Sequence, residues 1–175
     1  MAMNNTNIFI LHEEPNWSTI FPDIENIANS VVSAVFEYVA TNETIDFLDG
    51  QKPIMFNLSL SNNQLVQNLN KEYRNIDKPT NVLSFAAIDD MDFYNDIALY
   101  EEIELGDIII ALETLQQEAE LKQISLHDHF CHLLTHGLLH LLGFDHIEDD
   151  EAEYMEAAEI KILENMNIPN PYQEL

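Results

Sequence analysis

The sequence of 175 residues contains one cysteine, four glycines and six basic side chains, of which a single one is an arginine. A lone cysteine, Cys131, excludes an internal disulfide, which is typical of proteins from a reducing compartment. No apolar run approaches the length of a membrane span, and no basic segment followed by an apolar one lies near the start. We therefore expect a soluble, cytoplasmic protein without a membrane partner.

Positive charge is scarce because 32 acidic residues face only six basic ones, for a formal net charge of −26. Such a charge repels nucleic acids and anionic membranes at long range and favours solubility. Two acidic stretches, residues 89–104 and 148–159, are expected to form solvent-exposed faces and loops. The overall charge counts against DNA as a partner and makes any RNA contact depend on local features.

Hydrophobic patterning predicts strands mixed with helices in a single domain that spans residues 1–175. Period-two or continuous apolar stretches predict strands at residues 7–11, 54–61, 82–85 and 108–110. Apolar residues at three- and four-residue steps predict helices at residues 24–39, 65–73, 112–121, about 125–142 and 155–166. Ser125 is the expected N-cap of the fourth of these helices. The pattern favours an α/β or α+β fold.

Three histidines punctuate the stretch H-G-L-L-H-L-L-G-F-D-H, at His136, His140 and His146. On a helix, His136 and His140 point the same way from adjacent turns, as a two-pronged metal clamp. Gly143 predicts the end of the helix and a reversal that brings His146 in as third ligand. Three imidazoles leave one tetrahedral position open, which is typical of catalytic zinc, and the spacing matches that of metzincin metalloproteases.

His132 forms a second four-residue pair with His136 but lacks a downstream third ligand. We therefore expect it to pack or to donate a supporting hydrogen bond rather than to bind metal.

Gly137 occupies the position at which zinc peptidases with the H-E-x-x-H motif carry their general base. Because glycine cannot act as a general base, the sequence argues against peptide hydrolysis.

Half of the basic side chains lie within eight residues, as Lys71, Arg74 and Lys78. The planar guanidinium of Arg74 is suited to phosphate oxygens, whereas a surface salt bridge is the alternative role. Tyr73 and Phe85 are candidates for stacking on unpaired bases, with core packing as the alternative for Phe85. This segment is the expected substrate-binding region.

Several motifs together resemble the YbeY family of bacterial metal-dependent endoribonucleases. The resemblance rests on the histidine stretch and on L-N-K-E-Y-R, P-T-N-V-L-S-F-A and L-G-D-I-I-I-A, which follow the family's order between Leu69 and His146. Asn81 stands where the family has an aspartate, so a role for that carboxylate in catalysis would be lost, whereas a turn-capping role would be kept. Asp107 and Asp145 are either carboxylates that support the metal ligands or turn caps.

The resemblance implies a zincin-like α+β fold with a small mixed sheet beside the metal-bearing helix. It implies one zinc per chain bound by His136, His140 and His146, and a catalytic role for Arg74. It also implies cleavage of single-stranded RNA in maturation of the 3′ end of 16S ribosomal RNA and in ribosome quality control, with ribosomal RNA and the small ribosomal subunit as partners. Two other hypotheses remain: a zinc peptidase or other small hydrolase, and a non-catalytic ribosome assembly factor with structural zinc.

Overall fold

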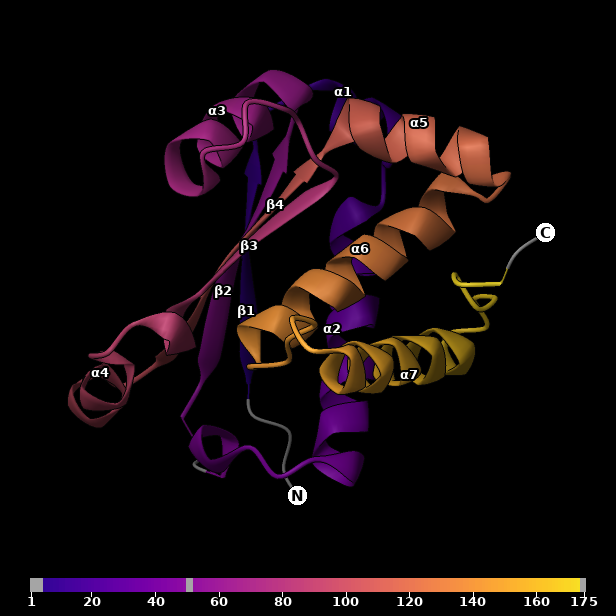
Figure 1. Ribbon diagram of the computed structural model, residues 1–175. Helices are drawn as coiled ribbons and strands as arrows, with labels where there is room; N and C mark the ends of the chain where they lie inside the picture. Colours follow the sequence, from indigo (N-terminus) through magenta and orange to yellow (C-terminus); the bar gives the residue numbers. More distant parts are fainter. Residues whose placement is uncertain (1–4, 50–51, 174–175) are drawn as a thin grey trace.

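A four-stranded mixed sheet lies at the centre of the computed structural model, which describes residues 5–49 and 52–173 (Figure 1). Its strands are β1 (Thr6–His12), β2 (Ile54–Ser61), β3 (Val82–Ala86) and β4 (Ile103–Ala111), in the order β1-β2-β4-β3. β1, β2 and β4 are parallel, whereas β3 pairs antiparallel with β4 at one edge. The α+β class and the mixed sheet are confirmed.

Helices make up much of the remaining described chain and connect the parallel strands. They are α1 (Asn16–Ile20), α2 (Ile24–Asn42), α3 (Asn63–Arg74), α4 (Phe93–Leu99), α5 (Leu112–Lys122), α6 (Leu126–Leu141) and α7 (Asp149–Asn165), with short 3-10 turns η1 (Asp46–Leu48) and η2 (Ala87–Asp89). Among the residues that the structure describes, no helix has both the length and the hydropathy needed to cross a membrane.

Both faces of the sheet are covered, and successive side chains of β4 point alternately to one face and to the other. Ile108 and Ile110 belong to the main core with residues of α2 and α6. Ile109 and Ala111 instead join a second, smaller cluster with Val66 of α3. Figure 1 shows α3 on one side of the sheet and α2, α6 and α7 on the other.

α6 is the helix that carries the histidines, and its start is fixed by a side-chain cap. Ser125 Oγ accepts a hydrogen bond of 3.0 Å from the backbone N–H of Asp128, as the sequence predicts. Gly137 faces the sheet, where a Cβ atom would lie 3.0 Å from Ile108 Cγ2 and 3.2 Å from Ser84 Oγ. The glycine therefore allows α6 to pack closely on β3 and β4, and a side chain at this position would crowd Ser84 and Ile108.

Most acidic residues of the two acidic stretches are exposed, as expected, on helices as well as on loops; the exception is Glu159, which is buried. Residues 89–104 contain α4 and the first residues of β4, because Phe93 and Ile103 supply buried anchors between the acids. Residues 148–159 form the start of α7, where Glu148 and Glu151 make a capping box. Acidic residues are favoured in the first turn of a helix, so a high density of them does not by itself indicate a loop.

Candidate metal centre

Three histidines converge at the C-terminal end of α6. Their ring centroids are 4.6 Å apart for His136 and His140, 4.8 Å for His140 and His146, and 5.5 Å for His136 and His146. One possible ligand nitrogen from each lies within 4.8 Å of the others. The cluster could therefore hold a metal ion through three imidazole nitrogens.

The reversal of the chain after α6 brings His146 to the two helical histidines. Gly143 has a φ of 95°, a conformation that favours glycine. Its N–H donates to the carbonyl of His140 and the N–H of Phe144 donates to the carbonyl of Leu139, both at 3.0 Å. These bonds end the helix and fold the following loop back, as the position of Gly143 in the sequence predicts.

Hydrogen-bond partners determine which ring nitrogens of His136 and His140 carry a proton. His136 Nδ1 lies 2.6 Å from Glu159 Oε1, and His140 Nδ1 lies 2.9 Å from the carbonyl oxygen of Phe144. Because both partners accept, each neutral ring is protonated on Nδ1 and presents a lone pair on Nε2. The two Nε2 atoms are 3.2 Å apart. Two lone pairs at this distance repel each other unless a cation lies between them, so the donor set fits a metal ion.

The charges around the cluster also favour metal binding. Burial, together with the charges of the neighbouring His136 and His146, lowers the pKa of His140 to about 4. His140 is thus neutral at neutral pH, the form that binds metal. Burial acts to raise the pKa of Glu159, but hydrogen bonds from His132 and His136 outweigh it and lower the pKa to about 2. An ionised carboxylate therefore lies behind the ring of His136.

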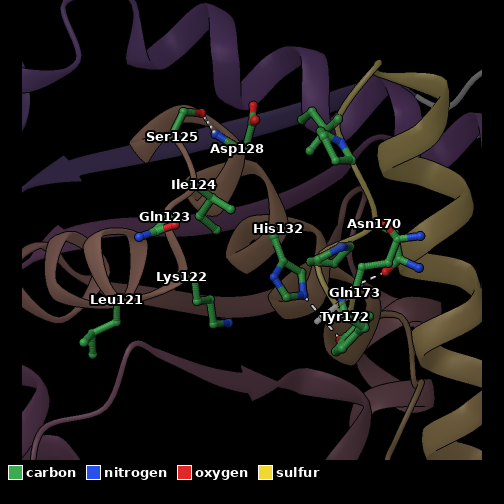
Figure 2. Close-up of a pocket in the computed structure, with 13 residues that line it drawn as sticks. Leu121, Lys122, Gln123, Ile124, Ser125, Asp128, His132, Asn170, Tyr172 and Gln173 are labelled. Atoms are coloured by element: carbon green, nitrogen blue, oxygen red, sulfur yellow. Dashed lines mark hydrogen bonds between the residues drawn. The ribbon is translucent and has the colours of Figure 1, made fainter. Parts of the chain in front are cut away.

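His132 lies one turn before His136 and outside the cluster. Its Nε2 atom is 2.9 Å from Glu159 Oε2 and 3.3 Å from the hydroxyl of Tyr172. Figure 2 shows the ring directed toward Tyr172 in a pocket of about 720 Å³ between the turn that joins α5 to α6 and the C-terminal segment. His132 thus forms the supporting hydrogen bond expected for it.

The predicted substrate-binding residues lie at and just beyond the C-terminal end of α3. Lys71, Arg74 and Lys78 are all exposed, and Lys71 forms an ion pair of 2.8 Å with Asp77. Within the described ranges, the side chain of Arg74 makes no hydrogen bond or ion pair. Because α3 and α6 cover opposite faces of the sheet, Arg74 does not contact the histidines here, and its catalytic role stays a prediction.

Asn81 acts as a cap at the start of β3. Its Oδ1 atom accepts a hydrogen bond of 2.7 Å from the N–H of Val82. Its Nδ2 atom donates to both carboxylate oxygens of Glu118, at 3.2 and 3.0 Å. Asn81 thus makes the kind of capping contact that one of the two alternatives assigns to this position. An aspartate at the same position would place a second carboxylate against Glu118, so asparagine and Glu118 are matched to each other.

The remaining candidates lie away from the metal ligands or serve the backbone. Asp145 Oδ1 accepts a hydrogen bond of 2.7 Å from the N–H of His146, which is a turn-capping contact. Asp107 accepts a hydrogen bond of 2.8 Å from Asn57 Nδ2. The rings of Tyr73 and Phe85 pack edge to face, 5.2 Å apart, along a groove of about 460 Å³ beside α3. The two aromatic candidates thus contact each other on the α3 side of the sheet.

Known proteins match this chain over most of its length. The family model described as Endoribonuclease YbeY matches residues 16–167. The Endoribonuclease YbeY of Paramagnetospirillum magneticum is 39% identical over 160 residues, which cover 91% of this chain and 92% of the relative. That of Sinorhizobium fredii is 38% identical over 170 residues, or 97% of this chain and 94% of the relative.

A solved structure shares the fold. The solution structure of TM1509 from Thermotoga maritima superposes with a TM-score of 0.53 at 20% identity, covering 96% of this chain and all of that protein. The sequence matches to the family and to its relatives carry the assignment, and they include the stretch that holds the three histidines. The chain belongs to the family of the endoribonuclease YbeY.

Proposed function

We propose that this chain is a zinc-dependent endoribonuclease that cleaves single-stranded RNA. The convergence of three imidazole nitrogens, two of them with lone pairs fixed toward each other, is the observation that carries the proposal. The relatives named Endoribonuclease YbeY support the same class of reaction. In this proposal the whole chain forms one catalytic domain.

Zinc is the metal that this donor set favours. Zinc binds neutral imidazole readily, and a site with three protein ligands keeps a fourth position open for substrate chemistry. His136, His140 and His146 would hold one ion per chain. When bound there, zinc would supply a Lewis acid for the phosphodiester and would lower the pKa of water toward neutrality. The chain itself orients the imidazoles, through Glu159 for His136 and through the carbonyl of Phe144 for His140.

Peptide hydrolysis is the less favoured reaction. Gly137 provides no general base, and a Cβ atom at this position would already crowd the side chains of Ile108 and Ser84. An RNA phosphodiester depends less on such a base, because stabilisation of charge on the phosphoryl oxygens supplies much of the catalysis.

The RNA would contact both faces of the sheet. The metal ligands lie on the α6 side and Arg74 lies on the α3 side, with the edge strand β3 between them (Figure 1). An RNA that reaches both would pass around the free edge of β3, which a flexible single-stranded RNA can do more easily than a duplex. With few cations available, binding would be weak unless the RNA is presented, and ribosomal RNA on the small ribosomal subunit is the proposed source.

The test is cleavage by the purified chain of a single-stranded RNA and of casein, with zinc and with a chelator. We expect cleavage of the RNA alone, loss of activity with chelator, and recovery when zinc is restored. Robust digestion of casein without RNA cleavage would overturn the proposal in favour of a peptidase. Bound zinc without cleavage of either substrate would instead favour a structural metal and an assembly role.

A further inference from the structure

Glu159 is the one acidic residue of the described chain that is fully buried, with a relative exposure of 0%. A buried carboxylate is costly unless each oxygen has a partner. Oε1 accepts from His136 Nδ1 at 2.6 Å. Oε2 accepts from His132 Nε2 at 2.9 Å and from the hydroxyl of Tyr172. The carboxylate is therefore held from two sides, by α6 and by the C-terminal segment.

The bond to His136 has a direct effect on the metal site. Because the carboxylate accepts the Nδ1 proton, Nε2 of His136 is left as the free nitrogen that faces His140. A negative charge behind a ligating imidazole also makes that imidazole a stronger donor. His132 and Tyr172 determine where the other oxygen lies, and their rings pack edge to face at 5.4 Å. The orientation of His136 thus depends on α7 and on the segment around Tyr172.

We propose that Glu159 is a positioning residue of the metal centre, held in place by His132 and Tyr172, and that it orients and strengthens His136 as a metal ligand. The inference rests on the proposed zinc site and assigns the residue that sets its affinity. Glu159 does not contact substrate or metal in this scheme. It acts through the ring of His136.

The chain contains a matched carboxylate–imidazole pair without a metal ligand. Glu118 Oε2 lies 2.7 Å from Nε2 of His129, which is buried on the same helix as His136. Removing the charge of Glu118 therefore perturbs a buried histidine of α6 but leaves the ligands untouched. A loss of zinc affinity that follows Glu159 and not Glu118 would distinguish positioning from a general effect on folding.

The experiment measures the zinc dissociation constant by competition with a chromophoric chelator, and thermal unfolding of the metal-free protein. Glu159→Gln keeps the shape but removes the charge, and we expect zinc affinity to fall by about 10–100-fold. Glu159→Asp keeps the charge but shortens the reach, so it should fold and bind zinc more weakly than the parent. The control Glu118→Gln should bind zinc with the affinity of the parent, whatever its thermal stability.

The outcomes separate this inference from the proposal on which it rests. If the parent chain binds no zinc, the metal site itself fails and the role of Glu159 fails with it. If the parent binds zinc and either Glu159 variant binds equally tightly, only the positioning role is overturned. An equal loss of affinity in Glu118→Gln would also overturn it, because the effect would then belong to the packing of α6.

Discussion

Individual histidines on α6 have different tasks, although they share a helix and a four-residue spacing. His136 and His140 direct Nε2 toward a common point, whereas His132 directs Nε2 toward the carboxylate of Glu159. The difference follows from the partner that each ring meets, since imidazole can donate, accept or ligate according to its tautomer. Sequence spacing alone leaves both pairs possible, and the third ligand decides between them.

The first prediction separates the two pairs by metal content. The parent chain should contain one zinc per molecule, His140→Ala should lose it, and His132→Ala should retain it. Of these two residues only His140 offers a nitrogen to the ion, whereas His132 affects the affinity alone, through Glu159. Elemental analysis of the purified proteins measures the ratio of zinc to protein. Retention of zinc in His140→Ala together with loss in His132→Ala would mean that the other pair binds the metal.

The second prediction concerns the geometry of Arg74. Arg74→Lys keeps the charge but loses the planar pair of donors, so it should lower the RNA cleavage rate nearly as far as Arg74→Ala, by on the order of 10²-fold. Zinc content should stay that of the parent, and RNA binding should change little. Single-turnover kinetics measure the rate and filter binding measures the affinity.

Lys71→Ala is the matched control for Arg74, because it removes a charge from the same helix. We expect it to weaken RNA binding while leaving the single-turnover rate near that of the parent. Its effect on binding should be moderate, since Lys71 is already paired with Asp77. Cleavage by Arg74→Ala at the parent rate would reduce Arg74 to a surface charge.

At the scale of elements, the end of α6 matters as much as the helix itself. Gly143 turns the chain so that His146 meets the histidines of the last two helical turns. A Cβ atom at this residue would meet only Ile88 Cδ1, at an ordinary 3.5 Å. Any cost of a substitution therefore comes from the backbone conformation and not from a clash.

The third prediction tests the backbone conformation of Gly143. Gly143→Ala should lower the free energy of unfolding by about 1–2 kcal/mol, since a side chain disfavours a φ of 95°. Zinc affinity should fall as well, because relief of the strain moves His146. Urea unfolding of the metal-free protein and a zinc titration measure the two effects.

Gln123, at the end of α5, provides the reciprocal control. It has a φ of 54° with a side chain present, so Gln123→Gly relieves strain and should leave the free energy of unfolding undiminished. Its zinc affinity should match that of the parent. A Gly143→Ala variant with the stability and zinc affinity of the parent would show that the turn does not constrain His146.

How much of the structure is predictable from the sequence depends on the distance between interacting residues. The ligands and the cap at Ser125 follow from local helical geometry, which a spacing of a few residues determines. Glu159 could not be found in this way, because it lies in an acidic run and meets His136 only through the packing of α7 on α6. The strand order also involves pairing between distant segments, on which hydrophobic patterning has no bearing.

At the scale of the whole molecule, charge is the dominant feature. The net charge of −26 is spread over a surface with few cations, while the described interior contains one ionised carboxylate, Glu159, with its own partners. Repulsion among like charges disfavours the compact state and is weakened by salt. The folded chain should therefore be more sensitive to ionic strength than a protein of balanced charge.

The fourth prediction follows from this repulsion. The melting temperature of the metal-free protein should rise between about 0.01 M and about 1 M NaCl, as the screening length falls from roughly 30 Å to 3 Å. Calorimetry or circular dichroism measures the shift. A melting temperature that is constant or falls over this range would show that attractive ion pairs outweigh the repulsion.

The division of the buried residues into two clusters has a consequence for motion. α3 contributes Val66 to a cluster of four buried residues, whereas α6 supplies much of the main core. Transient detachment of α3 thus exposes few apolar side chains, and local openings of this kind cost less free energy than global unfolding. Amide hydrogens of α3 should exchange with solvent sooner than those of α6. The segment with Arg74 can then change its position relative to the sheet, while the histidines at the end of α6 keep theirs.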